Sequence, residues 1–287
     1  MTPMNANAYD LPLPLVDSIV ERALAEDLVS GDVTTEACID PDATAAADGV
    51  ARASIVACGA PVVARVFALV DPGLRFQVHV ADGQRANAGA VLWHVAGRAR
   101  SILMAERVAL NFAQRMSGVA TATRTYVDAL SPGSPTRITD TRKTTPGLRL
   151  LERYAVRCGG GKNHRDNLGS AVLIKDNHVA ACGGVARAIE RARAHAPHTC
   201  RIECEVDTLA QLDEALAARA DVVLLDNMDT PTVIEAVKRT AGRALLEASG
   251  GITPARVADL SRAGVDAISV GALTHSSPAV DIGLDFA

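Results

Sequence analysis

The segment DVVLLDNM, residues 221–228, decides the fold, because an apolar run of strand length ends abruptly in polar residues. Runs of the same kind recur as TRITD (136–140), AVLIK (171–175), RIECEV (201–206), LLEAS (245–249) and DAISVG (266–271). The last four runs start at residues 201, 221, 245 and 266, with helical patterns between them. Such βαβ units with near-continuous apolar strands predict a parallel sheet covered by helices. Six units favour a (β/α) barrel over an open doubly wound sheet.

Capping residues mark the expected helices between these strands. Thr208 and Gln211 have the spacing of a capping box, in which each side chain bonds the backbone of the other residue. Thr230 and Thr253 each precede a proline, which is favoured in the first turn of a helix. We therefore expect helices to begin at these positions.

The first part of the chain mixes helices and strands without a repeating order. Alternating apolar and polar residues predict a half-buried strand over Leu74–Val80, with Ala90–Val95 as its neighbour. The other expected elements are a helix over Leu15–Leu28, a loop at GDVTTEA (31–37), a strand over Gly49–Cys58, a helix over Pro61–Val70 and a helix over 101–118. We expect an N-terminal α+β domain at residues 1–115 and the (β/α) domain at residues 116–287.

Composition excludes several classes of protein. With 48% hydrophobic residues and mixed-sign charge, the 287-residue chain is not intrinsically disordered. A formal net charge of −4 and only 3% aromatic residues argue against a nucleic-acid partner. The sequence shows no secretory signal and no apolar run of membrane-spanning length. Six scattered cysteines without a Cys-x-x-Cys pair are typical of reduced thiols, so we expect a cytoplasmic protein.

Polar residues follow almost every predicted strand. They are Asp140–Lys143, Lys175–His178, Asp207, Asp226–Asn227, Ser249–Gly251 and Ser269–Gly271. Function gathers at the carboxyl ends of the strands in parallel α/β folds. One such ending could be plain helix capping, which is the alternative for Asp207 and Asn227. Six endings on one rim predict a functional site.

The site residues divide by the sign of their charge. Arg142, Lys143, Arg165 and Lys175, together with His164, form a cationic set. Four positive charges that converge repel one another unless an anion balances them, so the set predicts a polyanionic substrate. The alternative is that individual members are solvated loop residues.

Two acids complete the predicted chemistry. Glu205 and Asp226 lie one βα unit apart, so neighbouring strands could bring them together to hold Mg²⁺ against substrate phosphates. A general acid/base pair is the competing interpretation. We expect the strand pleat to turn Glu203 and Glu205 to opposite faces, and periodicity does not decide which of them points inward.

Glycine turns after the last two strands form a third element. Ser249, Gly250 and Gly251, and in the next unit Ser269 and Gly271, leave backbone N–H groups near helix starts, which is a common way to bind phosphate. The sequence GGGK at 159–162 lacks the spacing of a Walker phosphate loop and is rejected as one.

Long motifs resemble a known family. The resemblance lies in the segment DTRKTTPGLRLLERYAVRCGGGKNHR (140–165) and, after it, in LIKDNH, IECEVDTLAQLDEAL, VVLLDNM, EASGGIT and ISVGALTHSSPAVDIGLDF. The chain is similar to quinolinate phosphoribosyltransferase, also called nicotinate-nucleotide pyrophosphorylase (carboxylating). LAEDLVSGDVTTEA and AERVALNFAQRMSGVAT extend the resemblance toward the N-terminus. It implies an N-terminal α/β domain, an open, incomplete barrel and a homodimer. It also implies transfer of phosphoribose from 5-phosphoribosyl-1-pyrophosphate to quinolinate, giving nicotinate mononucleotide, pyrophosphate and CO₂ in NAD synthesis.

The resemblance also implies roles for residues. Arg107 would come from the partner subunit. The quinolinate carboxylates would be held by Arg142, His164, Arg165 and Lys175. The phosphates would lie near Lys143 and Lys175. Glu205 and Asp226 would bind Mg²⁺ and the ribose hydroxyls, and Lys143, Lys175, Glu205 and Asp226 form the catalytic set. The 5-phosphate would lie against Ser249, Gly250, Gly251 and Gly271, with Thr141 and Ser269 in the same substrate-binding set.

One turn departs from the family pattern. The family has a glycine and an aspartate where this chain has Asn167 and Ser170, and we expect Asn167 to take the positive φ of the glycine.

Three alternative functions remain open. A paralogue could use another acceptor such as nicotinate, although it would be expected to lose part of the Arg142, His164, Arg165 set. Lys175 could instead form a Schiff base, or the barrel could bind a ligand without catalysis.

Overall fold

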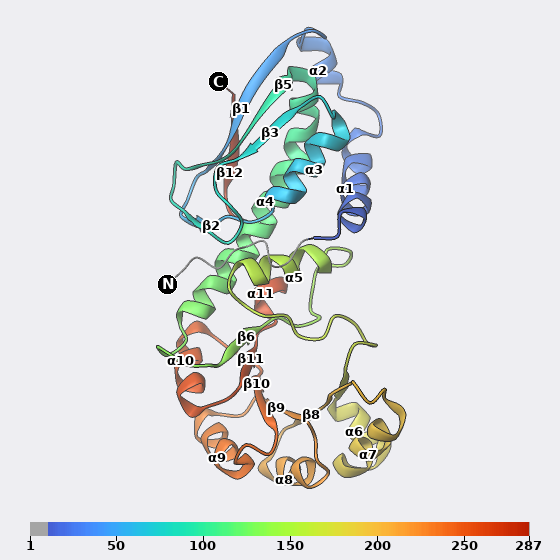
Figure 1. The fold of residues 1–287 in the computed structure, drawn as a ribbon, viewed down its shortest axis with the longest axis vertical. Coiled ribbons are helices and arrows are strands. Elements are labelled where there is room, and N and C mark those ends of the chain that lie inside the picture. Colours follow the sequence, from blue (N-terminus) through green and yellow to red (C-terminus); the bar gives the residue numbers. More distant parts are fainter. Residues whose placement is uncertain (1–10, 287) are drawn as a thin grey trace. The chain divides into compact units, whose positions relative to one another are not determined.

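The computed structural model describes residues 11–286 and divides them into two compact units (Figure 1). Unit 1 is built from the described part of Met1–Arg124 with Thr144–Gly160 and Thr274–Ala287, and unit 2 from Thr125–Lys143 with Gly161–Leu273. The predicted division at residues 115 and 116 falls inside the continuous helix α4 (Ala99–Asp128) and so stays a proposal. The compact units follow other boundaries, because two later segments of the chain return to unit 1.

Unit 1 contains an antiparallel sheet of four strands in the order β12-β1-β5-β3. These strands are β1 (Thr44–Ala51), β3 (Arg75–Val78), β5 (Val91–Arg98) and β12 (Ile282–Phe286), and β2 (Ile55–Val56) pairs separately with β4 (Arg85–Ala86). Its helices are α1 (Leu13–Leu28), α2 (Val33–Cys38), α3 (Ala60–Val70), most of α4, α5 (Arg149–Cys158) and the second half of α11 (Ala272–His275). The predicted pairing of the half-buried strand with its neighbour is confirmed as β3 with β5.

Two local predictions in unit 1 were wrong. The expected loop at 31–37 contains helix α2, because the Asp32 carboxylate accepts a hydrogen bond from the Thr35 backbone N–H at 3.0 Å and caps the first turn. The expected strand over Gly49–Cys58 is instead divided into β1 and β2. Strand β1 begins earlier, at Thr44, because its first residues pair with the end of β5, and β12 pairs with it from Ala47 onward.

Unit 2 contains a six-stranded parallel sheet in the order β6-β11-β10-β9-β8-β7. Its strands are β6 (Arg137–Thr139), β7 (Val172–Ile174), β8 (Ile202–Val206), β9 (Val222–Asp226), β10 (Leu245–Ser249) and β11 (Ala267–Ser269). Helices α6 (Asp176–Cys182), α7 (Val185–His195), α8 (Leu209–Ala217), α9 (Thr230–Thr240) and α10 (Pro254–Ala263) lie along its outer side (Figure 1). Strands β6 and β7 are the two edges, so the predicted open (β/α) barrel is confirmed.

The helix starts in unit 2 test the capping predictions. The capping box is confirmed, since Gln211 N–H donates to Thr208 Oγ1 at 3.2 Å and Thr208 N–H donates to Gln211 Oε1 at 3.2 Å. Thr253 is the N-cap of α10, as predicted. Helix α9 starts one residue earlier than predicted, because Asp229 is its cap and accepts from the Thr232 N–H at 2.9 Å.

Strand register separates an apolar face of this sheet from a polar one. Residues paired across strands share a face, and side chains alternate along each strand. One face carries apolar or thiol side chains, most of them buried, among them Ile138, Ile174, Cys204, Val206, Val223, Leu225, Ala248 and Ile268. The other face, called the polar face, carries Thr139, Glu203, Glu205, Asp226, Glu247, Ser249 and Ser269 together with apolar residues such as Leu173, Val222 and Leu224. Burying each aliphatic side chain contributes about 1.5–3 kcal/mol, which fixes the polar face on the opposite side.

The register overturns one expectation about the acids of β8. Glu203 and Glu205 are two residues apart on the strand, so the pleat turns them to the same face. The expectation of opposite faces was wrong, because only neighbours in sequence alternate. Both carboxylates therefore belong to the polar face.

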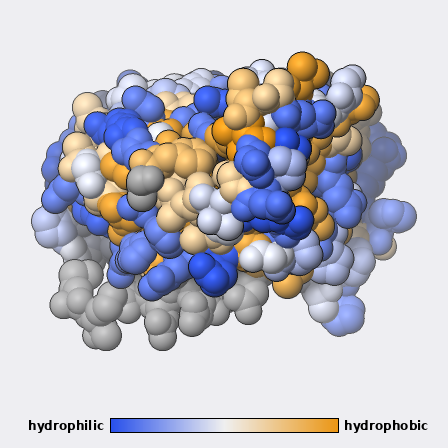
Figure 2. Space-filling view, turned by 90° about the horizontal axis from the view of Figure 1, so that it is seen from above, coloured by the Kyte–Doolittle hydropathy of each residue, from blue (hydrophilic) through white to orange (hydrophobic). Residues whose placement is uncertain are grey.

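The outer surface mixes residue types. Hydrophilic and hydrophobic residues are interspersed on the face that Figure 2 shows. Within residues 11–286, every helix is too short or too polar to serve as a membrane span.

Candidate active site

The cationic residues of unit 2 lie on three segments: Arg142 and Lys143 directly after β6, Arg165 between α5 and β7, and Lys175 directly after β7. Arg142 and Arg165 are half-buried, and Lys143 and Lys175 are exposed. Burial, and then the neighbouring positive charge of Arg142, lower the pKa of the Arg165 guanidinium. The charge of Arg142 thus opposes that of Arg165 in the folded chain. Such a pair favours an anion between or beside the guanidinium groups.

His164 lies against two buried carboxylates of the polar face. Its Nε2 atom is 3.1 Å from Glu203 Oε2 and 3.5 Å from Glu247 Oε1. The loop that carries it is fixed by the fully buried Asp140, which accepts hydrogen bonds from the His164 N–H at 2.7 Å and from Asn163 Nδ2 at 2.6 Å. The predicted site residue is therefore held by acids that the sequence did not assign to it.

The close packing of this cluster shifts the pKa values of Glu247 and His164. Burial, and then the charge of Glu203, raise the pKa of Glu247 to about 7. Burial opposes the charged imidazolium of His164, but its hydrogen bond to Glu203 and the charges of the surrounding carboxylates together raise its pKa. Both shifts have the same cause, which is that a buried pair of acids needs a proton or a cation beside it.

This cluster predicts a pH dependence of stability. The pKa of the Glu247 carboxyl is about 7 in the folded chain, whereas an unfolded chain releases this proton around its ordinary pKa of 4.5. Its contribution to the free energy of unfolding is thus fully present below pH 4.5 and is lost as pH rises through 7, by on the order of 3 kcal/mol. We expect Glu247→Gln to remove this loss, as measured by urea unfolding between pH 4.5 and 8. Parallel pH profiles for the two proteins would contradict the assignment, and Glu214→Gln, at an exposed position, is the control.

Lys175 and Glu205 form an ion pair at the ends of β7 and β8. Lys175 Nζ donates to Glu205 Oε2 at 2.6 Å, with exposed side-chain fractions of 48% for the lysine and 11% for the glutamate. The pair follows from the register, since Ile174 pairs with Cys204 and the next two residues share the polar face. The ammonium group thus stays open to a ligand while its carboxylate partner is largely buried.

Asp226 and the first glycine turn meet at the end of the sheet. Asp226 pairs in register with Ser249 and lies on the same face as Glu205, one strand away. Gly250 has φ of +86°, and a Cβ there would lie 2.1 Å from Asn227 Oδ1, so only glycine fits against the neighbouring turn. Arg256 Nη1, on helix α10, donates to the Gly250 carbonyl at 3.3 Å, and this hydrogen bond holds the turn in place.

The other predicted site residues lie on the segment after β6, at the end of β11 and on α4. The Lys143 N–H donates to Thr141 Oγ1 at 3.1 Å in the segment after β6. Ser269 is buried at the end of β11, and Gly271 follows it at the start of the short connection to α11. Arg107 belongs to unit 1, where it is exposed on α4.

The turn that departs from the family pattern is held by side chains. Asn167 Oδ1 accepts from the Gly169 N–H at 2.8 Å, and Ser170 Oγ accepts from the Asp166 N–H at 3.0 Å. The expected positive φ at Asn167 was wrong, because Asn167 is not among the non-glycine residues with positive φ. A side-chain turn replaces the glycine conformation.

Sequence reasoning placed Asp140 among the polar strand endings without a role and missed Glu247 as part of the site. Glu247 had a signal, since an acid inside the apolar strand LLEAS must be buried and therefore needs a partner. Arg256, which fixes the glycine turn, gave no comparable signal because it lies in an ordinary helix.

The open parallel sheet defines an α/β protein whose polar and charged residues lie at the carboxyl ends of its strands, where sites are commonly found in such folds. Two family models match this chain: quinolinate phosphoribosyl transferase, N-terminal domain, over residues 32–117, and quinolinate phosphoribosyl transferase, C-terminal domain, over residues 119–285. The chain belongs to the quinolinate phosphoribosyltransferase family.

Individual relatives match over nearly the whole chain. Nicotinate-nucleotide pyrophosphorylase [carboxylating] from Mycobacterium leprae is 46% identical, covering 93% of this chain and 95% of that protein. The solved structure of NadC from Streptococcus pyogenes has a TM-score of 0.93 at 42% identity, covering 98% of this chain and all of that one. The nicotinate-nucleotide pyrophosphorylase from Francisella tularensis has a TM-score of 0.91 at 38% identity, covering 97% of this chain and 98% of that one.

Proposed function

We propose that this protein is a quinolinate phosphoribosyltransferase, a pentosyltransferase of NAD biosynthesis. It transfers phosphoribose from 5-phosphoribosyl-1-pyrophosphate to the ring nitrogen of quinolinate and releases nicotinate mononucleotide, pyrophosphate and CO₂. One observation carries the proposal: in a chain of this family, the cationic and acidic residues of the motif gather at the carboxyl ends of one sheet.

The charges suit two multiply charged anions. Arg142, Arg165 and His164 hold the quinolinate carboxylates, and the mutual repulsion of the two guanidinium groups is relieved when a dianion binds. Glu203 and Glu247 keep His164 oriented and favour its charged form. A protonated imidazole is a better carboxylate ligand than a neutral one.

The other end of the site receives the phosphoribosyl donor. Backbone N–H groups of Gly250, Gly251 and Gly271, with Ser249 and Ser269, bind the 5-phosphate at the turns after β10 and β11. Lys143 and Lys175 neutralise charge on the pyrophosphate as it leaves, and Thr141 orients the lysine loop through its bond to the Lys143 N–H.

Glu205 and Asp226 fit a magnesium ion. They offer hard carboxylate oxygens from neighbouring strands on one face, both side chains are neither fully buried nor fully exposed, and Mg²⁺ prefers one or two such ligands plus substrate oxygens. When bound, the ion supplies positive charge that neutralises phosphate oxygens. Lys175 holds the Glu205 carboxylate in place before substrate arrives.

The reaction then needs positioning more than covalent catalysis. The ring nitrogen attacks the ribose carbon as the bond to pyrophosphate breaks, and side chains that hold both substrates supply the alignment. The alkylated ring nitrogen is positive, so it accepts the electron pair left behind when the adjacent carboxylate departs as CO₂. A proton then replaces the carboxylate on the ring carbon.

The quaternary structure and location belong to the same proposal. We expect a homodimer in which Arg107 reaches the partner's site, supported by its exposed position on α4. A cytoplasmic location is supported by six free cysteines in a chain of this length.

One assay tests the activity directly. Purified protein is incubated with 5-phosphoribosyl-1-pyrophosphate, Mg²⁺ and quinolinate labelled in the carboxylate next to the nitrogen. We expect labelled CO₂, nicotinate mononucleotide and pyrophosphate in equal amounts. Turnover of nicotinate without CO₂ release, and no reaction of quinolinate, would instead identify a paralogue with another acceptor.

A further inference from the structure

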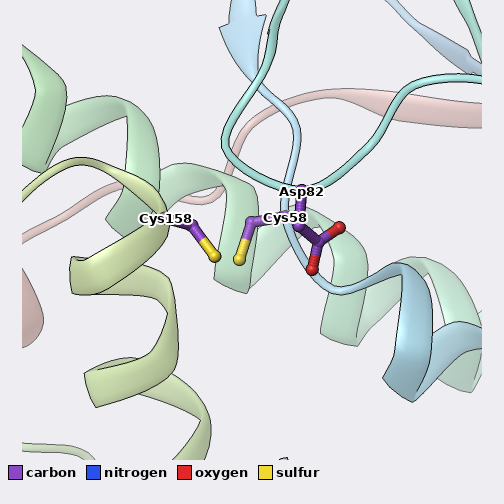
Figure 3. A group of neighbouring side chains, drawn as sticks. All are labelled: Cys58, Asp82 and Cys158. Atoms are coloured by element: carbon purple, nitrogen blue, oxygen red, sulfur yellow. The ribbon is translucent and has the colours of Figure 1, made fainter. Parts of the chain in front are cut away.

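Two cysteines of unit 1 lie together, although they are far apart in the sequence. Cys58 lies between β2 and α3, and Cys158 is the last residue of α5. Their sulfur atoms and a carboxylate oxygen of Asp82 all lie within 4.8 Å of one another. Figure 3 shows the two sulfur atoms pointing toward each other, with the carboxylate to one side.

Other contacts hold both cysteine backbones in place. Ser117 Oγ of α4 accepts from the Cys58 N–H and donates to the Cys58 carbonyl, each at 3.0 Å. Gly159, next to Cys158, lies so close to α4 that an added Cβ would be 2.5 Å from the Thr123 Cβ atom. One helix therefore fixes the approach of the two thiols.

Asp82 has a separate structural role. Its carboxylate accepts from the Gly59 N–H at 2.9 Å and the Ala60 N–H at 3.1 Å, which caps the start of α3, and from the Tyr154 hydroxyl at 2.8 Å. Three donors thus engage both oxygens without a cation. A metal ion would need to compete with these bonds, so the contact between the sulfur atoms is the feature that remains to be explained.

The two thiols differ in access to solvent. Cys58 is only 4% exposed, whereas Cys158 is half-buried. Burial raises the pKa of the Cys58 thiol well above its ordinary value, so this residue stays protonated. A small oxidant therefore meets Cys158 first, and Cys58 lies behind it as the only thiol of the cluster left to react.

We propose that Cys58 and Cys158 are a redox modification site, at which a peroxide produces a reversible disulfide. The Cys158 thiol and hydrogen peroxide give a sulfenic acid and water. The Cys58 sulfur then attacks the oxidised sulfur, the S–O bond breaks, and a second water leaves with the Cys58 proton. A dithiol reverses the reaction by exchange and is itself oxidised.

The bond would join the start of α3 to the end of α5. It closes a loop of about 100 residues, which restricts the unfolded chain strongly. Cys158 also directly precedes the glycines that lead to Asn163, His164 and Arg165. The disulfide would thus restrict the motion of the N-terminal end of the segment that carries predicted substrate ligands.

Mass spectrometry after mild oxidation tests the proposal. The full-length protein is treated with hydrogen peroxide, alkylated and digested with trypsin. We expect a linked pair of peptides, residues 53–65 and 158–162, that dithiothreitol separates. Thiol titration in denaturant should fall from the six cysteines of the sequence to four, and the melting temperature should rise by roughly 5 °C or more.

Matched variants distinguish this pair from other chemistry. Cys158→Ser should abolish the linked peptides, whereas Cys182→Ser, at another half-buried thiol, should retain them. Oxidation of Cys158 to a sulfinic acid with Cys58 still alkylatable would overturn the proposal. So would stoichiometric zinc in the purified protein that is lost in Cys158→Ser, because the cluster would then be a metal site. None of these readouts depends on the proposed enzymatic activity.

Discussion

Replacing Glu205 with alanine should lower the rate of nicotinate mononucleotide formation by roughly 10²–10³-fold, the usual cost of losing one preorganised charged group. The variant loses a carboxylate proposed to hold Mg²⁺ and the ribose hydroxyls, and Lys175 loses its partner at 2.6 Å. The released lysine is 48% exposed, so water can solvate it and the fold should persist. Steady-state kinetics with circular dichroism of the same samples measures both effects.

Two further variants make this result specific. Lys143→Ala should abolish turnover as well, since it removes a positive charge near the leaving pyrophosphate. Glu214→Ala, on the exposed side of α8, removes an acid away from the strand ends and should leave the rate unchanged. Wild-type rates in both Glu205→Ala and Lys143→Ala would overturn the site assignment.

Replacing Glu152 with alanine should destabilise the protein by about 3–5 kcal/mol, the cost of leaving a buried charge without its partner. Glu152 is 1% exposed on α5 and contacts Arg115 Nη2 at 2.6 Å. It also accepts from the Thr145 N–H at 3.0 Å and the Thr145 hydroxyl at 2.7 Å. One carboxylate on α5 thus connects this helix to α4 and to the loop between β6 and α5, and its loss breaks both connections.

Urea unfolding monitored by circular dichroism measures this change. Glu152→Gln keeps a hydrogen-bonding oxygen without the charge, so it should fall between wild type and alanine. Asp259→Ala, which breaks the exposed ion pair of Asp259 with Arg262, is the control and should change stability little. Equal stabilities for Glu152→Ala and Asp259→Ala would show that the buried pair has no net stabilising role.

Most of unit 2 was predictable because its signals are local. Each strand of the parallel sheet is an apolar run followed by polar residues, and Thr208 with Gln211 marks a helix start within four residues. Capping residues can mislead by one position when two candidates are adjacent, as with Asp229 and Thr230. Unit 1 was less predictable, since the start of β1 pairs with β5, about 50 residues later, and the rest of β1 pairs with β12, more than 200 residues away.

The sequence by itself determined the parallel sheet, the positions of its polar strand ends and the family, because periodicity and contiguous motifs are properties of neighbouring residues. Only the tertiary structure decided that Glu203 and Glu247 hold His164, that Glu205 pairs with Lys175, and that Cys58 faces Cys158. These contacts join residues from 30 to 100 positions apart. Their geometry depends on strand register and helix packing, which a pattern of single residues does not contain.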